Sequence, residues 1–364
     1  MKETYDQLID SLNSRGGSLP AIKCDELYAL LMEIFTEEEA EMFSRMPFAS
    51  SSPEQIAESA GKSTEATVAI LEGMADKGLI TTREREGRRV YAAIPLVPGI
   101  FEFQLMKGGT SERDKELARL FDDYFKAAQE IPLEDVKIPT VPFSRVIPVE
   151  EEIKIGIEVY PYDILSEYVE KTEHIAVSAC YCRHHSELLG DPCDKPKEVC
   201  LSFGPGAKFV AERGFGRLVS KEEARKILDT AEEAGLIHCS SNTANYIDFV
   251  CNCCDCHCGI VKSLKEQMRN FGSASNYIVE VDADNCSGCE LCTERCPMDA
   301  IVMKDAVAER MDERCVGCGL CVSSCDVDAL RMVNRPERQD PPRNHRELMT
   351  SMLASMQKEG ATEA

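Results

Sequence analysis

Two stretches near the carboxyl end, CSGCELCTERCP (residues 286–297) and CVGCGLCVSSCD (residues 315–326), carry the most specific pattern in this chain of 364 residues. Within each stretch, four cysteines are separated by two, two and three residues. Three thiolates on one tight loop can reach three corners of a cube-shaped site. The positions are Cys286, Cys289, Cys292 and Cys296, followed by Cys315, Cys318, Cys321 and Cys325.

This tandem spacing resembles that of the bacterial ferredoxins that hold two [4Fe–4S] clusters, over about residues 277–333. The resemblance implies that the fourth cysteine of each run lies on a short helix and points at the other cluster. It implies one cluster surrounded by Cys286, Cys289, Cys292 and Cys325. It implies a second cluster surrounded by Cys315, Cys318, Cys321 and Cys296. Zinc is the alternative, but zinc prefers closed pairs of C-x2-C.

Other residues of this region are expected to support the clusters. Gly288, Gly317 and Gly319 would leave room for backbone N–H groups to approach sulfide. The expected apolar cover, which keeps out water and helps to set the potential, is Ile278, Ile301 and Leu330. Asp326 stands where the family usually has proline, and its carboxylate is expected to lower the potential of the nearer cluster.

A second group of cysteines lies in CYCRHHSELLGDPCDKPKEVC, residues 180–200. Its four thiolates, Cys180, Cys182, Cys193 and Cys200, can close one tetrahedral or cubane site. Arg183, His184 and His185 follow at once, and cationic side chains beside a cluster would raise its potential. Zinc is a rival here. We favour iron–sulfur because the neighbouring region already has that character.

The third group is CNCCDCHCG, residues 251–259, with Cys251, Cys253, Cys254, Cys256 and Cys258. Five thiols are too many for one cubane and too few for two, although Cys239 offers a sixth. Four of them holding a further [4Fe–4S] cluster is the interpretation we favour. The alternatives are that some complete the Cys180 site, or that the Cys253–Cys254 pair resembles, weakly, the double-cysteine motifs of heterodisulfide reductases.

Strand alternation predicts how the third group is divided. Cys254, Cys256 and Cys258 would point to one side, and Cys251 and Cys253 to the other. We expect His257 to be a solvated side chain rather than a ligand.

The amino-terminal part predicts helices and a small hairpin. Ser52, Pro53 and Gln55 have the pattern of a helix start, and that helix should end at Gly61. A second helix is expected over residues 64–77, with Gly78 as its stop, followed by a hairpin of LITT and VYAAI. This order resembles a winged-helix domain. The would-be recognition helix is acidic, which argues against DNA binding and for protein docking.

The predicted fold class is α+β, in five parts. They are a winged-helix-like domain (1–95), a helix and proline-rich linker (96–150), a cysteine-rich iron–sulfur domain (151–272), a ferredoxin-like dicluster domain (273–334) and a carboxyl-terminal tail (335–364). The linker should be extended or lie as a strap on a neighbouring surface. Residues 227–251 are expected to form a helix, a glycine stop and a hairpin whose strands end near Cys239 and Cys251.

Composition limits partners and location. The net charge is −23, from 41 basic and 64 acidic residues, which repels nucleic acid and membranes and suits a basic patch on a protein partner. Eighteen of the 19 cysteines follow residue 179, a density typical of metal binding in a reducing cytosol. The polar amino terminus lacks a signal-peptide core, and no apolar run approaches the roughly 20 residues of a membrane span. A cytoplasmic location is expected.

These features predict an electron-transfer subunit of an anaerobic redox complex, with two [4Fe–4S] clusters and one or two more. Such a chain is a component of an oxidoreductase rather than a stand-alone catalyst, and its partners are redox proteins. One alternative is a reductase whose middle domain exposes a cluster to a disulfide or small acceptor. Another is a winged-helix regulator controlled by an iron–sulfur redox sensor. No dinucleotide or Walker motif indicates a nucleotide cofactor.

Overall fold

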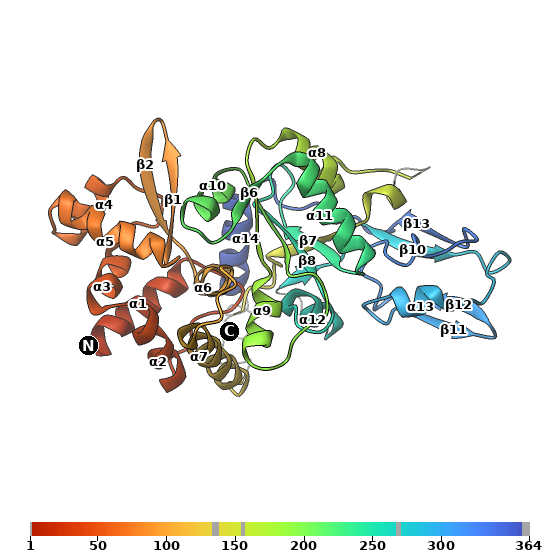
Figure 1. Ribbon diagram of the computed structural model, residues 1–364, viewed down its shortest axis with the longest axis horizontal. Helices are drawn as coiled ribbons and strands as arrows, with labels where there is room; N and C mark the ends of the chain where they lie inside the picture. The colour runs from red at the N-terminus through yellow and green to blue at the C-terminus, as the bar shows by residue number, and fades with distance from the viewer. Residues whose placement is uncertain (1, 133–137, 154–156, 267–270, 359–364) are drawn as a thin grey trace. The chain divides into compact units, whose positions relative to one another are not determined.

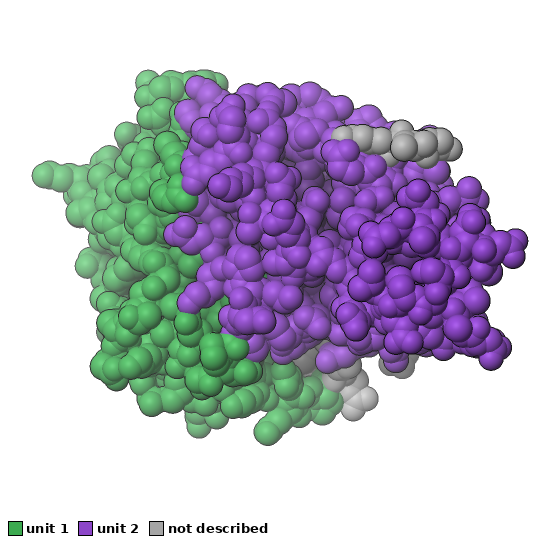
Figure 2. Space-filling view, turned by 45° about the vertical axis from the view of Figure 1, so that its right-hand side comes forward, with its two compact units in different colours: residues 1–138, 178–192, 205–218 green, residues 139–177, 193–204, 219–364 purple. Residues whose placement is uncertain are grey.

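The computed structural model describes residues 2–132, 138–153, 157–266 and 271–358. The chain divides into two compact units, coloured green and purple in Figure 2. The first unit contains residues 1–138, 178–192 and 205–218, and the second contains residues 139–177, 193–204 and 219–364. Both helices and strands are present, as the α+β prediction requires.

The first unit is mainly helical (Figure 1). Its helices are α1 (Lys2–Ser14), α2 (Asp25–Ile34), α3 (Glu37–Arg45), α4 (Pro53–Ala60), α5 (Thr64–Asp76), α6 (Ile100–Leu105), α7 (Glu112–Gln129), α9 (Tyr181–Leu188) and, from its second residue, α10 (Gly204–Glu212). Strands β1 (Ile80–Arg85) and β2 (Arg88–Ala93) form an antiparallel hairpin. Glu86 and Gly87 both have positive φ at its two-residue turn, which matches the twist of the strands.

The local signals of the amino-terminal part produce the predicted elements. The Ser52 side chain accepts from the Gln55 backbone amide, and the Gln55 side chain accepts from the Ser52 backbone amide, so α4 begins with a capping box. Gly61 ends α4 in the left-handed region, and Gly78, at φ 71°, follows α5. The helix, helix and hairpin predictions are therefore confirmed, whereas the winged-helix resemblance stays a prediction.

The second unit is built on a sheet with the strand order β6-β4-β5-β8-β7-β3-β9. The strands are β3 (Ser144–Ile147), β4 (Ile175–Ala179), β5 (Glu198–Phe203), β6 (Arg217–Val219), β7 (Ile237–Ser241), β8 (Phe249–Cys253) and β9 (Gly272–Ser273). Strand β8 is antiparallel to β5 and β7, and β3 is antiparallel to β7. The unit boundary crosses β4 and β6.

Two helices pack beside this sheet. They are α8 (Leu165–Lys171) and α11 (Lys221–Glu233), and their apolar side chains share one buried cluster with those of the strands. Its members include Leu165, Val169, Val177, Phe203, Leu228 and Val250. Ser220 caps α11 by accepting from the Glu223 amide, and Gly235 follows the helix at φ 75°. This core fixes the β7–β8 hairpin, which carries three of the cysteines.

The proline-rich stretch differs from its prediction at its end. Residues 133–137 lie outside the described residues, but Ser144–Ile147 forms β3, a fully buried strand between β7 and β9. A segment predicted as linker or strap is therefore part of the sheet here. The reason is pairing with partners distant in sequence, since Ser144 faces Ser241 on one side and Gly272 on the other.

The carboxyl-terminal region of the second unit has two further antiparallel pairs. Strand β10 (Tyr277–Val281) pairs with β13 (Leu330–Asn334), and β11 (Ile301–Lys304) pairs with β12 (Val307–Arg310). The remaining elements are the short 3-10 helices η2 (Glu150–Ile153) and η3 (Pro161–Asp163), α12 (Gly259–Lys265), α13 (Leu291–Arg295) and α14 (His345–Lys358). Leu348 and Met352 of α14 are buried, so this part of the tail is packed rather than frayed.

Candidate iron–sulfur and thiol centres

The first dicluster group lines one pocket. Its walls are the four cysteines that the ferredoxin resemblance assigns to one cluster, together with apolar residues of β11, β12 and β13. The cysteines are Cys286, Cys289, Cys292 and Cys325. The Ala308 amide donates to the Cys286 sulfur at 3.4 Å, and the Ala329 amide donates to the Cys325 sulfur at 3.2 Å. Such N–H···S bonds stabilise thiolates, so the lining fits an iron–sulfur cluster.

The second dicluster group is more deeply buried. After burial, the thiols of Cys318, Cys296 and Cys315 contribute most to raising the pKa of Cys321, and that of Cys292 contributes less. Burial raises the pKa of Cys318 to about 12, and burial also raises the pKa of Cys321 well above its usual value. The Ala300 amide donates to the Cys296 sulfur at 3.2 Å. A bound cluster would favour the thiolate form of these residues.

The fourth cysteine of each run therefore lies with the three cysteines of the other run. Cys296 directly follows α13, as the predicted short helix requires. Cys325 instead follows consecutive turns, in which the Val322 amide donates to Gly319 and the Cys325 amide donates to Val322. The second run thus reaches its partner group through tight turns and not through a helix.

The apolar cover differs from the prediction at one position. Ile301 and Leu330 belong to the buried cluster around these cysteines, with Cys292 and Cys321 among its members. Ile278 is buried but lies outside that cluster, which takes Tyr277 and Val279 from β10 instead. Side chains alternate along a strand, so Ile278 points to the other face.

The three predicted glycines all have positive φ, from 66° to 84°. The space beside each of these α-carbons is filled by other segments of the same polypeptide. A Cβ at Gly288 would lie 2.6 Å from the Ala306 oxygen, and one at Gly317 would lie 2.0 Å from the Tyr277 oxygen. Asp326, the departure from the family pattern, is exposed, so water screens its effect on the nearer cluster.

An inner thiol group forms on the β7–β8 hairpin. Cys239 lies directly opposite Cys251 in the antiparallel register, and Cys253 lies two residues further along the same face. The Cys253 thiol hydrogen-bonds those of Cys239, Cys251 and Cys258. These four side chains are between 0 % and 9 % exposed, and Cys200 adds a sulfur 4.0 Å from that of Cys251.

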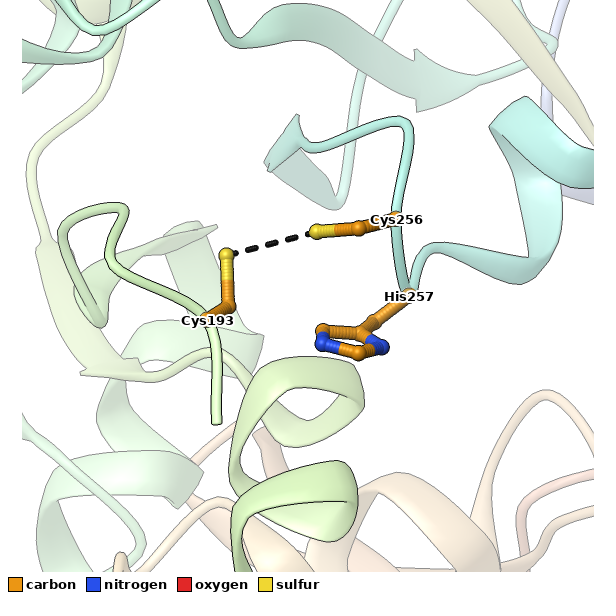
Figure 3. Close-up of side chains that lie close together, drawn as sticks. All are labelled: Cys193, Cys256 and His257. Atoms are coloured by element: carbon orange, nitrogen blue, oxygen red, sulfur yellow. Dashed lines mark hydrogen bonds between the residues drawn. The ribbon is translucent and has the colours of Figure 1, made fainter. Parts of the chain in front are cut away.

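An outer thiol group lies on the turn that follows β8. Cys254 and Cys256 hydrogen-bond each other, and the Cys256 sulfur lies 3.4 Å from that of Cys193 (Figure 3). Desolvation, followed by the adjoining thiols, raises the pKa of Cys256. A ring nitrogen of His257 lies within 4.8 Å of both sulfurs, so His257 is part of this group.

The predicted alternation of the third group is therefore wrong for Cys258. Strand β8 ends at Cys253, and the chain turns over residues 255–257. Cys258 immediately precedes α12 and returns to the inner group. The sequence offered Cys239 only as a possible sixth thiol of the third group. The predicted hairpin nevertheless placed it near Cys251.

The predicted group of Cys180, Cys182, Cys193 and Cys200 is divided between the units. Cys180 and Cys182 begin α9 in the first unit, and the other two belong to the second unit, where they contact Cys251 and Cys256. A single site formed by those four stays a prediction. His184 and His185 donate through Nε2 to the carbonyl oxygens of Gly109 and Ala118, at 2.8 and 2.9 Å.

Comparison with known protein families identifies the carboxyl-terminal region. A family model described as a 4Fe-4S dicluster domain matches residues 278–326. A search of curated proteins finds no match to the chain. Among the described residues, no helix is both long enough and apolar enough to cross a membrane. The dicluster domain and the 19 cysteines together indicate an iron–sulfur electron-transfer protein.

Proposed function

We propose that this chain relays electrons as the iron–sulfur subunit of a larger cytoplasmic redox complex in an anaerobe. The observation that carries the proposal is the crossed arrangement of eight cysteines in a region that matches a dicluster family. When bound there, each [4Fe–4S] cluster supplies a one-electron couple. The chain itself supplies thiolates, N–H donors and an apolar cover, and these set the potential.

The inner thiol group is the proposed third cluster site. Cys239, Cys251, Cys253 and Cys258 are four buried thiols on elements fixed by the sheet core. Four thiolates are the usual complement of a [4Fe–4S] cluster. Without a cation, ionising these thiols is costly, since the neighbouring thiols, followed by burial, raise the pKa of Cys253.

The cysteine content supports this function. All 19 cysteines lie among the described residues, and the structure joins none of them in a disulfide. Cysteines at this density suit a reducing compartment and metal binding rather than structural crosslinks. A cytoplasmic location and an anaerobic source are part of the proposal on this ground.

Redox protein partners, rather than nucleic acid, are the proposed binding partners. The net charge of −23 favours a basic protein surface. In the first unit, Arg89 pairs with Glu72 and Glu212 at 3.2 and 3.3 Å, and Arg213 pairs with Glu72 at 2.7 Å. Arginines neutralised within the unit offer little to phosphates, so the winged-helix-like part is proposed to dock a protein.

Iron and acid-labile sulfide content of anaerobically purified protein tests the proposal. We expect about twelve irons and about twelve sulfides per chain, because three [4Fe–4S] clusters contain that number. Cys253→Ser should reduce both to about eight, since the Cys253 thiol contacts every other member of the inner group. Electron paramagnetic resonance of the dithionite-reduced protein should show the dicluster signals unchanged.

Cys24→Ser is the matched control. Cys24 precedes α2 in the first unit, and the sequence assigns it no ligand role, so its removal should leave iron and sulfide unchanged. Colourless, iron-free wild-type protein would overturn the whole function. About eight irons in both wild type and Cys253→Ser would overturn the third cluster alone.

A further inference from the structure

The outer thiol group differs from the proposed cluster sites because it includes a histidine. The Cys193 and Cys256 sulfurs and a ring nitrogen of His257 all lie within 4.8 Å of one another, and the two sulfurs are 3.4 Å apart. Figure 3 shows the two cysteine side chains approaching each other from separate segments, with the imidazole beside them. All three residues belong to the second unit.

These separations fit one metal ion. In a tetrahedral site with metal–sulfur bonds of about 2.3 Å, two sulfurs lie about 3.8 Å apart. A histidine among the donors also favours a mononuclear centre, because [4Fe–4S] clusters are usually held by four cysteines.

A candidate fourth ligand is close to this trio in the sequence. The buried Cys254 thiol interacts with that of Cys256, although it lies outside the set whose ligand atoms are all within 4.8 Å of one another. With Cys254, the set would be three cysteines and one histidine. This is one of the ligand sets that zinc uses in structural sites, and thiolate with imidazole is the combination that borderline-soft divalent ions prefer.

The turn points its ligands away from the inner group. Cys253 and Cys258, on either side of the turn, contact the inner thiols, whereas Cys256 contacts Cys254 and Cys193. Lys265 of α12 lies 3.9 Å from Asp255 at the tip and 3.1 Å from Asp299. The ion pair with Lys265 therefore holds the tip of the turn. The cysteines that flank the turn belong to the inner group, and Cys256 within it belongs to the outer group.

We propose that Cys193, Cys254, Cys256 and His257 bind a single zinc-class divalent ion. This centre is separate from the iron–sulfur clusters. The ion ties the turn of residues 254–257 to the segment of Cys193, which is 63 positions away from Cys256 in the sequence. Because that turn joins Cys253 to Cys258, the ion also stabilises the inner thiol group from outside.

Metal analysis of the full-length, anaerobically purified protein tests the proposal without an activity assay. We expect about one zinc per chain beyond the cluster iron, because one tetrahedral set holds one ion. X-ray absorption at the zinc edge should show three sulfur ligands at about 2.3 Å and one nitrogen at about 2.0 Å. Both measurements use the wild-type protein and so do not depend on the folding of any variant.

Variants separate this centre from the clusters. Cys256→Ser and His257→Gln should each reduce zinc at least fivefold while iron, sulfide and the resonance spectrum stay unchanged. Cys24→Ser should retain zinc and iron. Loss of about four irons with about four sulfides in both variants would overturn the proposal, since the residues would then serve a cluster. Wild-type protein without zinc would overturn it as well.

Discussion

Gly317 is the residue at which the dicluster domain tolerates least change. Its φ is 66°, and a Cβ there would lie 2.0 Å from the Tyr277 oxygen and 2.4 Å from the Ser275 hydroxyl oxygen. Gly317→Ala should therefore cost roughly 3 kcal/mol or more, because left-handed strain adds to a clash with the backbone of β10. Iron content and the urea midpoint should both fall.

Gly61→Ala is the matched control for this prediction. Gly61 has nearly the same φ, 64°, but nothing lies within 4 Å of the added Cβ. Its cost should be about 1 kcal/mol, which is the left-handed strain alone. Equal losses of stability in the two variants, or full iron content in Gly317→Ala, would contradict the steric explanation.

Spacing predicted how the eight dicluster cysteines are grouped, because intervals of two, two and three residues limit which thiols one loop can bring together. Their role as cluster ligands stays a prediction. The structure brings the eight cysteines into the two groups that the ferredoxin resemblance implies. Spacing did not predict which residues of β10 cover the clusters, and Ile278 was the wrong choice. It stands between Tyr277 and Val279, and three consecutive apolar residues do not reveal which face of a strand is covered.

At the scale of elements, one buried ion pair joins the sheet to the dicluster domain within the second unit. Arg145 of β3 pairs with Asp163 of η3 and also donates to the Tyr162 carbonyl oxygen. Burial raises the pKa of Asp163, although Arg145 opposes the shift. The Tyr277 hydroxyl of β10 also acts to lower the pKa of Asp163. The pair therefore specifies how three elements meet.

Removal of the arginine alone should be costly. Arg145→Met leaves a buried carboxylate without its partner, and we expect a loss of about 3–5 kcal/mol in the free energy of unfolding. Arg145→Met combined with Asp163→Asn should recover much of that loss, because no charge then remains buried. Urea denaturation followed by circular dichroism measures both.

An exposed ion pair provides the comparison. Lys126 pairs with Asp122 at 2.6 Å on α7, with 70 % of the lysine side chain exposed, and Lys126→Met should cost well under about 1 kcal/mol. If the double variant is no more stable than Arg145→Met, the buried charge is not the source of the loss.

Elements defined by local signals were predictable, and elements defined by distant pairing were not. Helix starts are marked by capping residues within the same few positions, as at Ser52, Ser111 and Ser220. Helix ends are marked in the same local way by left-handed glycines. Strand β3 depends on a partner strand roughly 100 residues away, and the sequence around Ser144 contains no local signal for a strand. The end of β8 at Cys253 was missed because alternation cannot show where a strand stops.

On the scale of the whole molecule, the order of the seven strands could not be read from the sequence. Neighbours such as β5 and β8 are far apart in the chain, and β3 pairs with β7 and β9 in opposite directions. The division of the middle cysteines follows from that order. Cys200 of β5 meets Cys251 of β8 because those strands are adjacent, whatever the spacing of the cysteines.

The net charge of −23 predicts how the whole molecule meets other redox species. The reduced protein should pass electrons faster to a cationic oxidant than its driving force alone predicts, and this rate should fall about tenfold as salt rises from about 10 to 200 mM. The rate with an anionic oxidant should rise over the same range, and that with a neutral oxidant should stay nearly constant. Stopped-flow bleaching of cluster absorbance measures all three rates. If the rates with the cationic and anionic oxidants respond to salt in the same way, the acidic surface lies away from the site of electron exit. A basic docking patch on the partner would then have no support.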